Sequence, residues 1–143
     1  MPDRPAPDVV IVGGGVVGSS IAYHLAQRGM RNVLVLERDS FGAGSTGRNA
    51  GGIRLQFSTE INVRLSQRSI PRFERFQEEF GIDIAFQQVG YLFLITDADD
   101  AAPFERSLAL WSRLGVPARR LDPDGVREIF PELRLDDLCF ATF

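Results

Sequence analysis

Three glycines and one acid near the amino end have the residue types and the spacing to bind a nucleotide. Gly13, Gly15 and Gly18 form a G-x-G-x-x-G motif, and Glu37 follows 24 residues after the first of them (37 − 13 = 24). Dinucleotide-binding folds typically show a separation of about 20 residues. Such glycines permit a tight turn, a close approach of a pyrophosphate to the backbone, and close packing of a helix on a sheet. The acid accepts hydrogen bonds from a ribose hydroxyl and repels a 2′-phosphate, which argues against NADP.

The residues around the motif predict the elements that position it. Val9–Val12 is a run of four apolar residues, typical of a buried strand in a parallel sheet. Apolar residues then recur at helical spacing as far as Gly29, a helix stop, and Val33–Leu36 predicts a second strand. The free N–H groups at the start of this helix would face the phosphates. We therefore predict the α/β fold class with a Rossmann-like parallel sheet.

The segment 38–52 is rich in Gly, Ser, Thr and Asn. It is either a flexible loop or a second segment that contacts the ligand. The second interpretation is favoured because the loop leaves the carboxyl end of a strand, where such sheets bind ligands. In that case Ser45 and Thr46 offer hydroxyls, and Arg48 and Asn49 offer directed hydrogen-bond donors.

Composition bounds the class of protein. The chain has 143 residues, a net charge of −3 and 44% hydrophobic residues, which is typical of about one soluble globular domain. The charge balance predicts no nucleic-acid partner, and no apolar run reaches the ~20 residues of a membrane span. The single cysteine, Cys139, excludes an internal disulfide and favours a cytoplasmic location. We expect it in the core as a small hydrophobe, and no metal-ligand spacing is present.

The rest of the chain predicts two long helices. A strand at 53–57 precedes a helix that begins near Ser58 or Thr59, is kinked or split by Pro71 and ends at Gly81. The second long helix spans about 99–114. The buried stripe expected on the first helix comprises Ile61, Leu65, Phe73, Phe76 and Phe80.

Further strands are expected in the second half. The segments 84–86 and 91–95 are apolar enough for strands, and Asp122 is placed to cap a short helix that closes before Pro131. A last strand begins at Leu138. We expect this strand to be an edge without a partner, because the chain stops inside it.

The sequence from Val9 to Glu37, followed by GAGSTGRNAGGIRLQF, resembles the FAD-dependent amine and amino-acid oxidoreductases of the D-amino-acid oxidase, sarcosine oxidase and dye-linked L-proline dehydrogenase type. The later runs GYLFLITD and LDPDGVREIFPEL are similar to the same family. The resemblance implies FAD as the cofactor. It also implies a small secondary amine or amino acid of the sarcosine, glycine or L-proline type as the substrate, whose C–N bond is oxidised by hydride transfer to the flavin.

The resemblance further implies which residues line the cofactor. The expected FAD-binding set is Gly13, Gly15, Val17, Gly18, Glu37, Arg38, Ser45, Thr46, Arg48, Asn49, Gly51 and Gly52. Some relatives attach the flavin through a histidine where this chain has Arg48, so that bond cannot form here. Because the family's chains are much longer, we expect this sequence to be an amino-terminal fragment.

Arg54 is the residue that we expect to bind the substrate. A planar, always-charged guanidinium can bind a carboxylate through two N–H groups. In the resemblance Arg54 matches an arginine with that role in the sarcosine-oxidising members. The alternative is an exposed arginine on the solvent side of a strand.

The expected domains are residues 1–83, the amino-terminal part of a Rossmann-like FAD-binding domain, and residues 84–143, the start of a mixed-sheet substrate domain. Two other functions stay open. One is an NAD-dependent dehydrogenase with the same glycine motif, which the Ser- and Gly-rich second loop disfavours. The other is a non-catalytic FAD-binding subunit or assembly protein. A partner subunit or a homo-oligomer is compatible with each of these functions.

Overall fold

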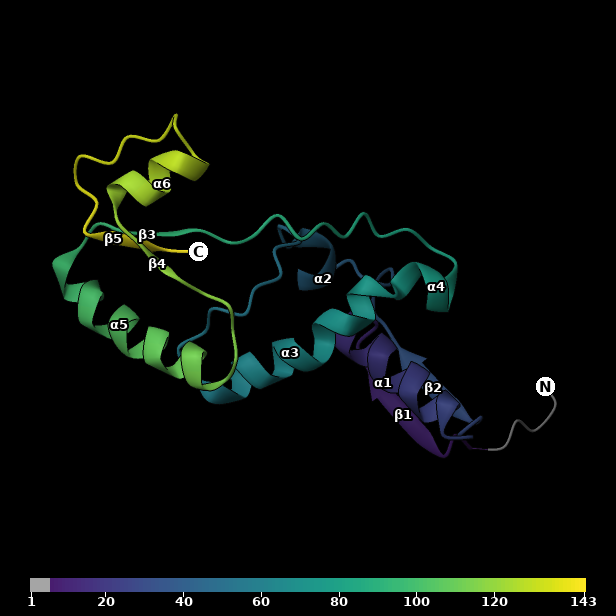
Figure 1. Ribbon diagram of the computed structural model, residues 1–143. Helices are drawn as coiled ribbons and strands as arrows, with labels where there is room; N and C mark the ends of the chain where they lie inside the picture. The colour runs from purple at the N-terminus through teal and green to yellow at the C-terminus, as the bar shows by residue number, and fades with distance from the viewer. Residues whose placement is uncertain (1–5) are drawn as a thin grey trace. The chain divides into compact units, whose positions relative to one another are not determined.

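The computed structural model describes residues 6–143 (Figure 1). The chain divides into two compact units, the first ending at Gly52 and the second beginning at Ile53. The domain boundary expected after residue 83 stays a prediction.

The first unit is a strand–helix–strand arrangement followed by an ordered loop. Strands β1 (Val9–Val12) and β2 (Val33–Leu36) pair in parallel, and helix α1 (Val16–Gln27) connects them. A short helix, α2 (Ser45–Arg48), lies in the loop after β2. Both strands and the long helix expected around the glycine motif are thus confirmed, and so is the α/β fold class.

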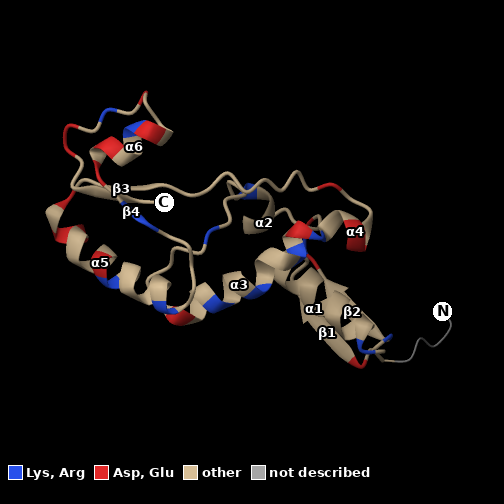
Figure 2. Ribbon diagram, viewed as in Figure 1, with Lys and Arg blue, Asp and Glu red and all other residues tan. Residues whose placement is uncertain are grey.

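Only one face of this two-stranded sheet is covered within the described residues. Ile11 is buried, at 8% exposure, and α1 contacts both strands. The opposite face is apolar and exposed. Its residues are Val10, Val12, Leu34 and Leu36. Figure 2 draws both strands in tan, the colour of residues other than Lys, Arg, Asp and Glu. The expected burial of the whole Val9–Val12 run is therefore wrong. Successive side chains of a strand point to opposite faces, and α1 covers one face.

The second unit begins with two consecutive helices. Helix α3 (Glu60–Glu74) contains Pro71, and α4 (Phe76–Phe80) follows it after a break at Arg75. The predicted split therefore occurs, but four residues after the proline. Gly81 ends α4 with a φ of +70°, a left-handed conformation that favours glycine.

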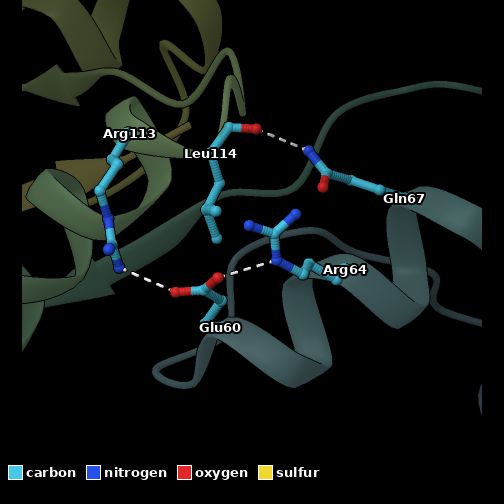
Figure 3. A network of polar contacts seen from close by, with 5 residues as sticks. All are labelled: Glu60, Arg64, Gln67, Arg113 and Leu114. Carbon is cyan, nitrogen blue, oxygen red and sulfur yellow. Dashed lines mark hydrogen bonds and ion pairs between the residues drawn. The ribbon is translucent and has the colours of Figure 1, made fainter.

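The buried stripe predicted for α3 is wrong in its first turns. Ile61 and Leu65 are 63% and 55% exposed, whereas Val63 is fully buried. The helix packs through the face that carries Glu60, Val63 and Gln67. Glu60 binds Arg113 and Gln67 binds the backbone of Leu114, both at the end of a later helix (Figure 3). On this face Val63 packs in the apolar cluster with Trp111, while Glu60 and Gln67 beside it are polar, so the spacing of apolar residues alone does not predict it.

Figure 3 shows these polar contacts. The Glu60 carboxylate binds Arg64 Nε at 2.8 Å and Arg113 Nη2 at 3.0 Å. The Gln67 side-chain amide donates to the Leu114 carbonyl oxygen at 2.8 Å. The hydrogen bond from Arg64 is the main reason that the pKa of Glu60 lies below its ordinary value.

The helices of the second half follow their sequence signals. Helix α5 (Ala98–Arg113) begins at Asp97, whose carboxylate accepts the Asp99 N–H at 2.9 Å. Helix α6 (Pro123–Ile129) begins at Asp122, whose carboxylate accepts the Gly125 N–H at 2.8 Å. Apolar residues of α5 and the residue after it belong to the cluster around Val63: Phe104, Leu108, Trp111 and Leu114.

The last strand lies at the centre of a sheet and not at its edge. Strands β3 (Phe93–Ile95), β5 (Phe140–Thr142) and β4 (Arg120–Leu121) pair antiparallel in the order β3–β5–β4. All three residues of β5 are buried. The expectation of an unpaired edge strand is wrong because both partners of β5 come from earlier segments that no local pattern connects to it.

Two other expected strands are absent from the structure. The segment 53–57 joins the sheet through a side chain instead of a ladder. Gln56 donates to the Tyr91 carbonyl oxygen at 2.6 Å and accepts from the Thr142 hydroxyl at 2.5 Å. The segment 84–86 contains Ala85 at a φ of 52°, which is incompatible with a strand.

Cys139 is exposed, so its expected place in the core is wrong. Its backbone N–H donates to the Ile95 carbonyl oxygen at 2.9 Å. That bond extends the pairing of β3 with β5 by one residue, while the thiol stays outside the buried cluster.

Candidate nucleotide site

The chain turns from β1 into α1 at glycines that the packing requires. Gly13 has a φ of +105°, and its N–H donates to the Leu36 carbonyl oxygen at 2.8 Å. A Cβ on Gly18 would lie 1.9 Å from the Gly13 carbonyl oxygen, so no side chain fits between α1 and the turn. These two glycines therefore make the tight turn and the close packing, and their contact with a cofactor stays a prediction.

Gly14 is equally constrained, although the motif leaves its position open. A Cβ there would lie 2.8 Å from Cδ1 of Phe41 and 3.1 Å from Cβ of Glu37. The Gly14 carbonyl oxygen also accepts the Gly42 N–H at 3.0 Å. Gly14 is not among the site residues predicted from the sequence. The signal that could have found it is the run of three consecutive glycines at 13–15.

The Glu37 carboxylate is held by two backbone N–H groups. Its Oε2 accepts from Gly14 at 2.7 Å, and its Oε1 accepts from Asp39 at 3.0 Å. The bond from Gly14 is the main reason that the pKa of Glu37 lies below its ordinary value of 4.5. A carboxylate oxygen has two lone pairs. Each oxygen of Glu37 therefore keeps an acceptor position that a hydroxyl group can use.

Thr46 binds the start of α1 from 30 residues away in the sequence. Its Oγ1 accepts the Val16 N–H at 2.9 Å. Gly15 makes room for this contact, since a Cβ on it would lie 3.0 Å from the same Oγ1 atom. Sequence reasoning placed Thr46 beside a ligand but did not foresee that it caps this helix.

The start of α1 keeps further N–H groups. The first intrahelical bond of α1 runs from the Ser19 N–H to the Gly15 carbonyl oxygen at 2.9 Å. The N–H groups of Val17 and Gly18 precede it and have no acceptor within the helix. Val17 is 69% exposed, whereas Gly18 is buried, so solvent reaches this turn of the helix at Val17.

The other expected site residues of the first unit lie on an ordered loop. Asn49 donates to the Thr46 carbonyl oxygen and accepts the Gly51 N–H at 2.7 Å, and Gly51 has a φ of +72°. These bonds and α2 order the segment that was expected to be either a flexible loop or a ligand contact. The remaining members of the predicted set are all exposed: Arg38, Ser45, Arg48 and Gly52.

Arg54 belongs to the second unit and is half-buried. Its Cζ lies 4.7 Å from the ring centroid of Phe57, 5.1 Å from that of Phe93 and 5.7 Å from that of Tyr91. Within residues 6–143 no Asp or Glu forms an ion pair with it. The alternative of a freely exposed arginine on a strand does not describe this side chain.

Two further features are absent from the part of the chain that the structure describes. No group of three or more His, Cys, Asp or Glu side chains is placed to hold a metal ion there. Over the same residues, no helix combines the length and the apolar character needed to cross a membrane.

Comparison with protein families decides the class of the chain. A family model described as "DAO: FAD dependent oxidoreductase" matches residues 8–143. The chain belongs to the FAD-dependent oxidoreductase family. The expected family and cofactor are thus confirmed, and FAD is the cofactor of that family.

Individual members of the family match almost all of the chain. Dimethylglycine dehydrogenase from Rattus norvegicus is 36% identical over 137 residues, which are 95% of this chain and 16% of the relative. The solved L-proline dehydrogenase from P. horikoshii is 38% identical, with a TM-score of 0.84 over 99% of this chain and 37% of its own. Glycine oxidase from Geobacillus kaustophilus is 29% identical, with a TM-score of 0.79 over 95% and 38%. The chain therefore spans less than half the length of each of these relatives.

The described residues of the first unit fit the nucleotide part of FAD. A Cβ on Gly13 would meet nothing within 4 Å, so open space lies beside the backbone of the turn. The accessible N–H groups of α1 and the Thr46 hydroxyl suit a diphosphate, and the Glu37 oxygens suit a ribose.

Proposed function

We propose that this chain is the FAD-binding part of an enzyme that oxidises the C–N bond of a small amino acid or secondary amine. The names of the relatives support this proposal, because dimethylglycine, L-proline and glycine each carry a nitrogen one carbon away from a carboxylate. Bound FAD would accept the hydride that the substrate loses, and the protein would supply binding and orientation.

The observation that carries the proposal is the convergence of two side chains on the glycine turn. Glu37 binds the Gly14 N–H from the end of β2, and Thr46 binds the Val16 N–H from α2. In the proposed function the α1 N–H groups and Thr46 would hold the diphosphate, and Glu37 would hold the ribose.

Arg54 is the residue proposed to bind the substrate carboxylate. Its five N–H donors lie in one plane, which matches the two oxygens of a carboxylate. The lack of an acidic partner among residues 6–143 supports this role, since an ion pair would occupy those donors. This binding would orient the amino group of the substrate.

Anaerobic titration of the FAD-loaded protein tests the proposal. Addition of sarcosine, glycine or L-proline should bleach the flavin absorbance for at least one of the three. The matched amines without a carboxylate, dimethylamine, methylamine and pyrrolidine, should reduce it much more slowly. A flavin that stays oxidised with every amino acid and amine tested would favour a non-catalytic FAD-binding subunit instead.

The alternative of an NAD-dependent dehydrogenase is disfavoured by membership of an FAD-dependent family. The purified protein gives a direct test, since bound flavin is yellow and NAD is not. Flavin absorbance that is retained after gel filtration supports FAD. A colourless protein that binds NAD with micromolar affinity would contradict the proposal.

A further inference from the structure

Arg54 is surrounded by three aromatic rings and has no acidic partner among residues 6–143. We propose that the rings of Phe57, Tyr91 and Phe93, here called the aromatic cradle, position the Arg54 guanidinium for a substrate carboxylate. This inference rests on the proposed function, in which Arg54 binds that carboxylate. The rings act through Arg54 and are positioning residues.

An aromatic cradle and an acidic partner hold an arginine in different ways. The negative face of a ring attracts a cation within about 6 Å of its centroid, and all three rings meet this criterion. An Asp or Glu would occupy the N–H donors and neutralise the charge, whereas a ring leaves the charge and its strong donors available. The cradle therefore restricts the side chain while leaving it able to bind an anion.

Buried hydrogen bonds fix the segments that carry the rings. Gln56, at 7% exposure, lies between Arg54 and Phe57 in the chain. Its amide donates to the Tyr91 carbonyl oxygen and accepts from Thr142, which is fully buried. One side chain thus joins the arginine segment to the segment that carries Tyr91.

The other two rings are held by α5. The Trp111 Nε1 group donates to the Phe57 carbonyl oxygen at 2.8 Å. The Phe93 ring packs on the Phe104 ring with centroids 5.6 Å apart. Trp111 and Phe104 both belong to a packed hydrophobic cluster of this unit, so the cradle is built against that cluster.

Other arginines near rings in the second unit lack this combination. The Arg119 Cζ lies 5.8 Å from one ring centroid, that of Phe143. The Arg120 Cζ lies 4.4 Å from the Phe140 centroid, but its Nε also forms an ion pair with Glu105 at 2.9 Å. Arg54 differs from both in that its half-buried guanidinium contacts three rings and forms no ion pair with an Asp or Glu of residues 6–143.

The experiment uses the FAD-loaded protein with acetate as the carboxylate probe. The variants Phe57→Leu and Tyr91→Leu each remove one ring, Tyr91→Phe keeps the ring, and Arg54→Gln removes the cation. Arg68→Gln is the matched control, since Arg68 is an exposed arginine of the same unit. The readouts are the acetate dissociation constant and the NMR resonance of the Arg54 Nε–H group, which is assigned by its loss in Arg54→Gln.

Removal of either ring should weaken acetate binding about 2- to 5-fold, the range expected for one exposed cation–π contact. It should also shift the Nε–H resonance downfield, since a proton above a ring is shielded. Tyr91→Phe and Arg68→Gln should keep the acetate affinity of the parent protein. In the Arg54→Gln background, loss of a ring should have no further effect on acetate binding.

Two results would overturn the inference. They differ in whether Arg54→Gln weakens acetate binding. If Arg54→Gln weakens acetate binding but both ring variants leave the affinity and the resonance unchanged, the cradle does not position Arg54, and the proposed carboxylate role stands. If Arg54→Gln itself binds acetate like the parent, the carboxylate role in the proposed function fails, and the inference fails with it. Two ring variants are included so that misfolding of one leaves a test.

Discussion

The carboxylate of Glu37 accepts the backbone N–H of Gly14 at 2.7 Å, across 23 residues of sequence. This bond ties the end of β2 to the turn that leads into α1. The same carboxylate is the group expected to hold a ribose, so the side chain that closes the turn is also the one proposed to contact the ligand. Changes at either residue should therefore affect folding and cofactor binding together.

Glu37→Gln should flatten the acid limb of the stability profile. Because the folded-state pKa of Glu37 lies below 4.5, the unfolded state binds the proton first, and stability rises with pH in this range. The contribution of the carboxylate is complete above its unfolded pKa and is lost as the pH falls from about 4.5 through the folded value. Urea unfolding between pH 3 and pH 7 measures the slope.

The control for this profile is Glu78→Gln, which removes an exposed carboxylate of α4. Comparison with this variant separates loss of the bond from Gly14 from loss of one surface carboxylate. An unchanged acid limb in Glu37→Gln would show that the bond from Gly14 does not favour the charged form.

Gly14→Ala should destabilise the protein by about 1–3 kcal/mol, the usual range for overpacking. The new Cβ would lie 2.8 Å from Cδ1 of Phe41 and 3.1 Å from Cβ of Glu37. We expect the FAD affinity to fall as well, because Glu37 must move. Chemical denaturation and flavin titration measure the two effects.

Gly44→Ala is the matched control for that substitution. A Cβ on Gly44 meets nothing within 4 Å, and its φ of −79° lies outside the left-handed region, although its ψ of −141° belongs to neither the helical nor the extended region. This variant therefore adds no packing clash, and its loss of stability should be smaller than that of Gly14→Ala. Equal losses for the two alanine variants would contradict the packing argument.

Thr46→Ala should cost about 1 kcal/mol, the typical value of a lost helix cap. The hydroxyl accepts the Val16 N–H at 2.9 Å, and the variant leaves that donor without its acceptor. FAD should bind more weakly, as the flavin titration will show. Thr46→Ser keeps the hydroxyl and should recover most of the lost stability and most of the lost FAD affinity. If Thr46→Ser loses as much of both as Thr46→Ala does, the effect is due to the methyl group.

Val63→Ala should destabilise the protein by about 2–3 kcal/mol, through lost apolar burial and a residual cavity. Val63 is fully buried, whereas Ile61 on the same helix is 63% exposed. Ile61→Ala should therefore change the free energy of unfolding by no more than about 0.5 kcal/mol. Thermal or urea unfolding measures both changes. A larger loss of stability in Ile61→Ala than in Val63→Ala would mean that Ile61, and not Val63, lies on the buried face of α3.

Local signals in the sequence determined much of this protein. A run of apolar residues predicts β1, helical spacing and Gly29 predict α1, and Asp122 predicts the start of α6, since each depends on neighbours within a few residues. The glycine motif with Glu37 likewise predicts a nucleotide site and, through the resemblance, indicates the family that the comparison confirms.

The tertiary structure alone decided which distant groups meet. The Glu37–Gly14 bond, the Thr46 cap on α1 and the rings around Arg54 join residues that are far apart in the chain. The central place of β5 and the polar packing face of α3 have the same origin. Such contacts depend on the path of the backbone between them, and a pattern within one segment carries no information about that path.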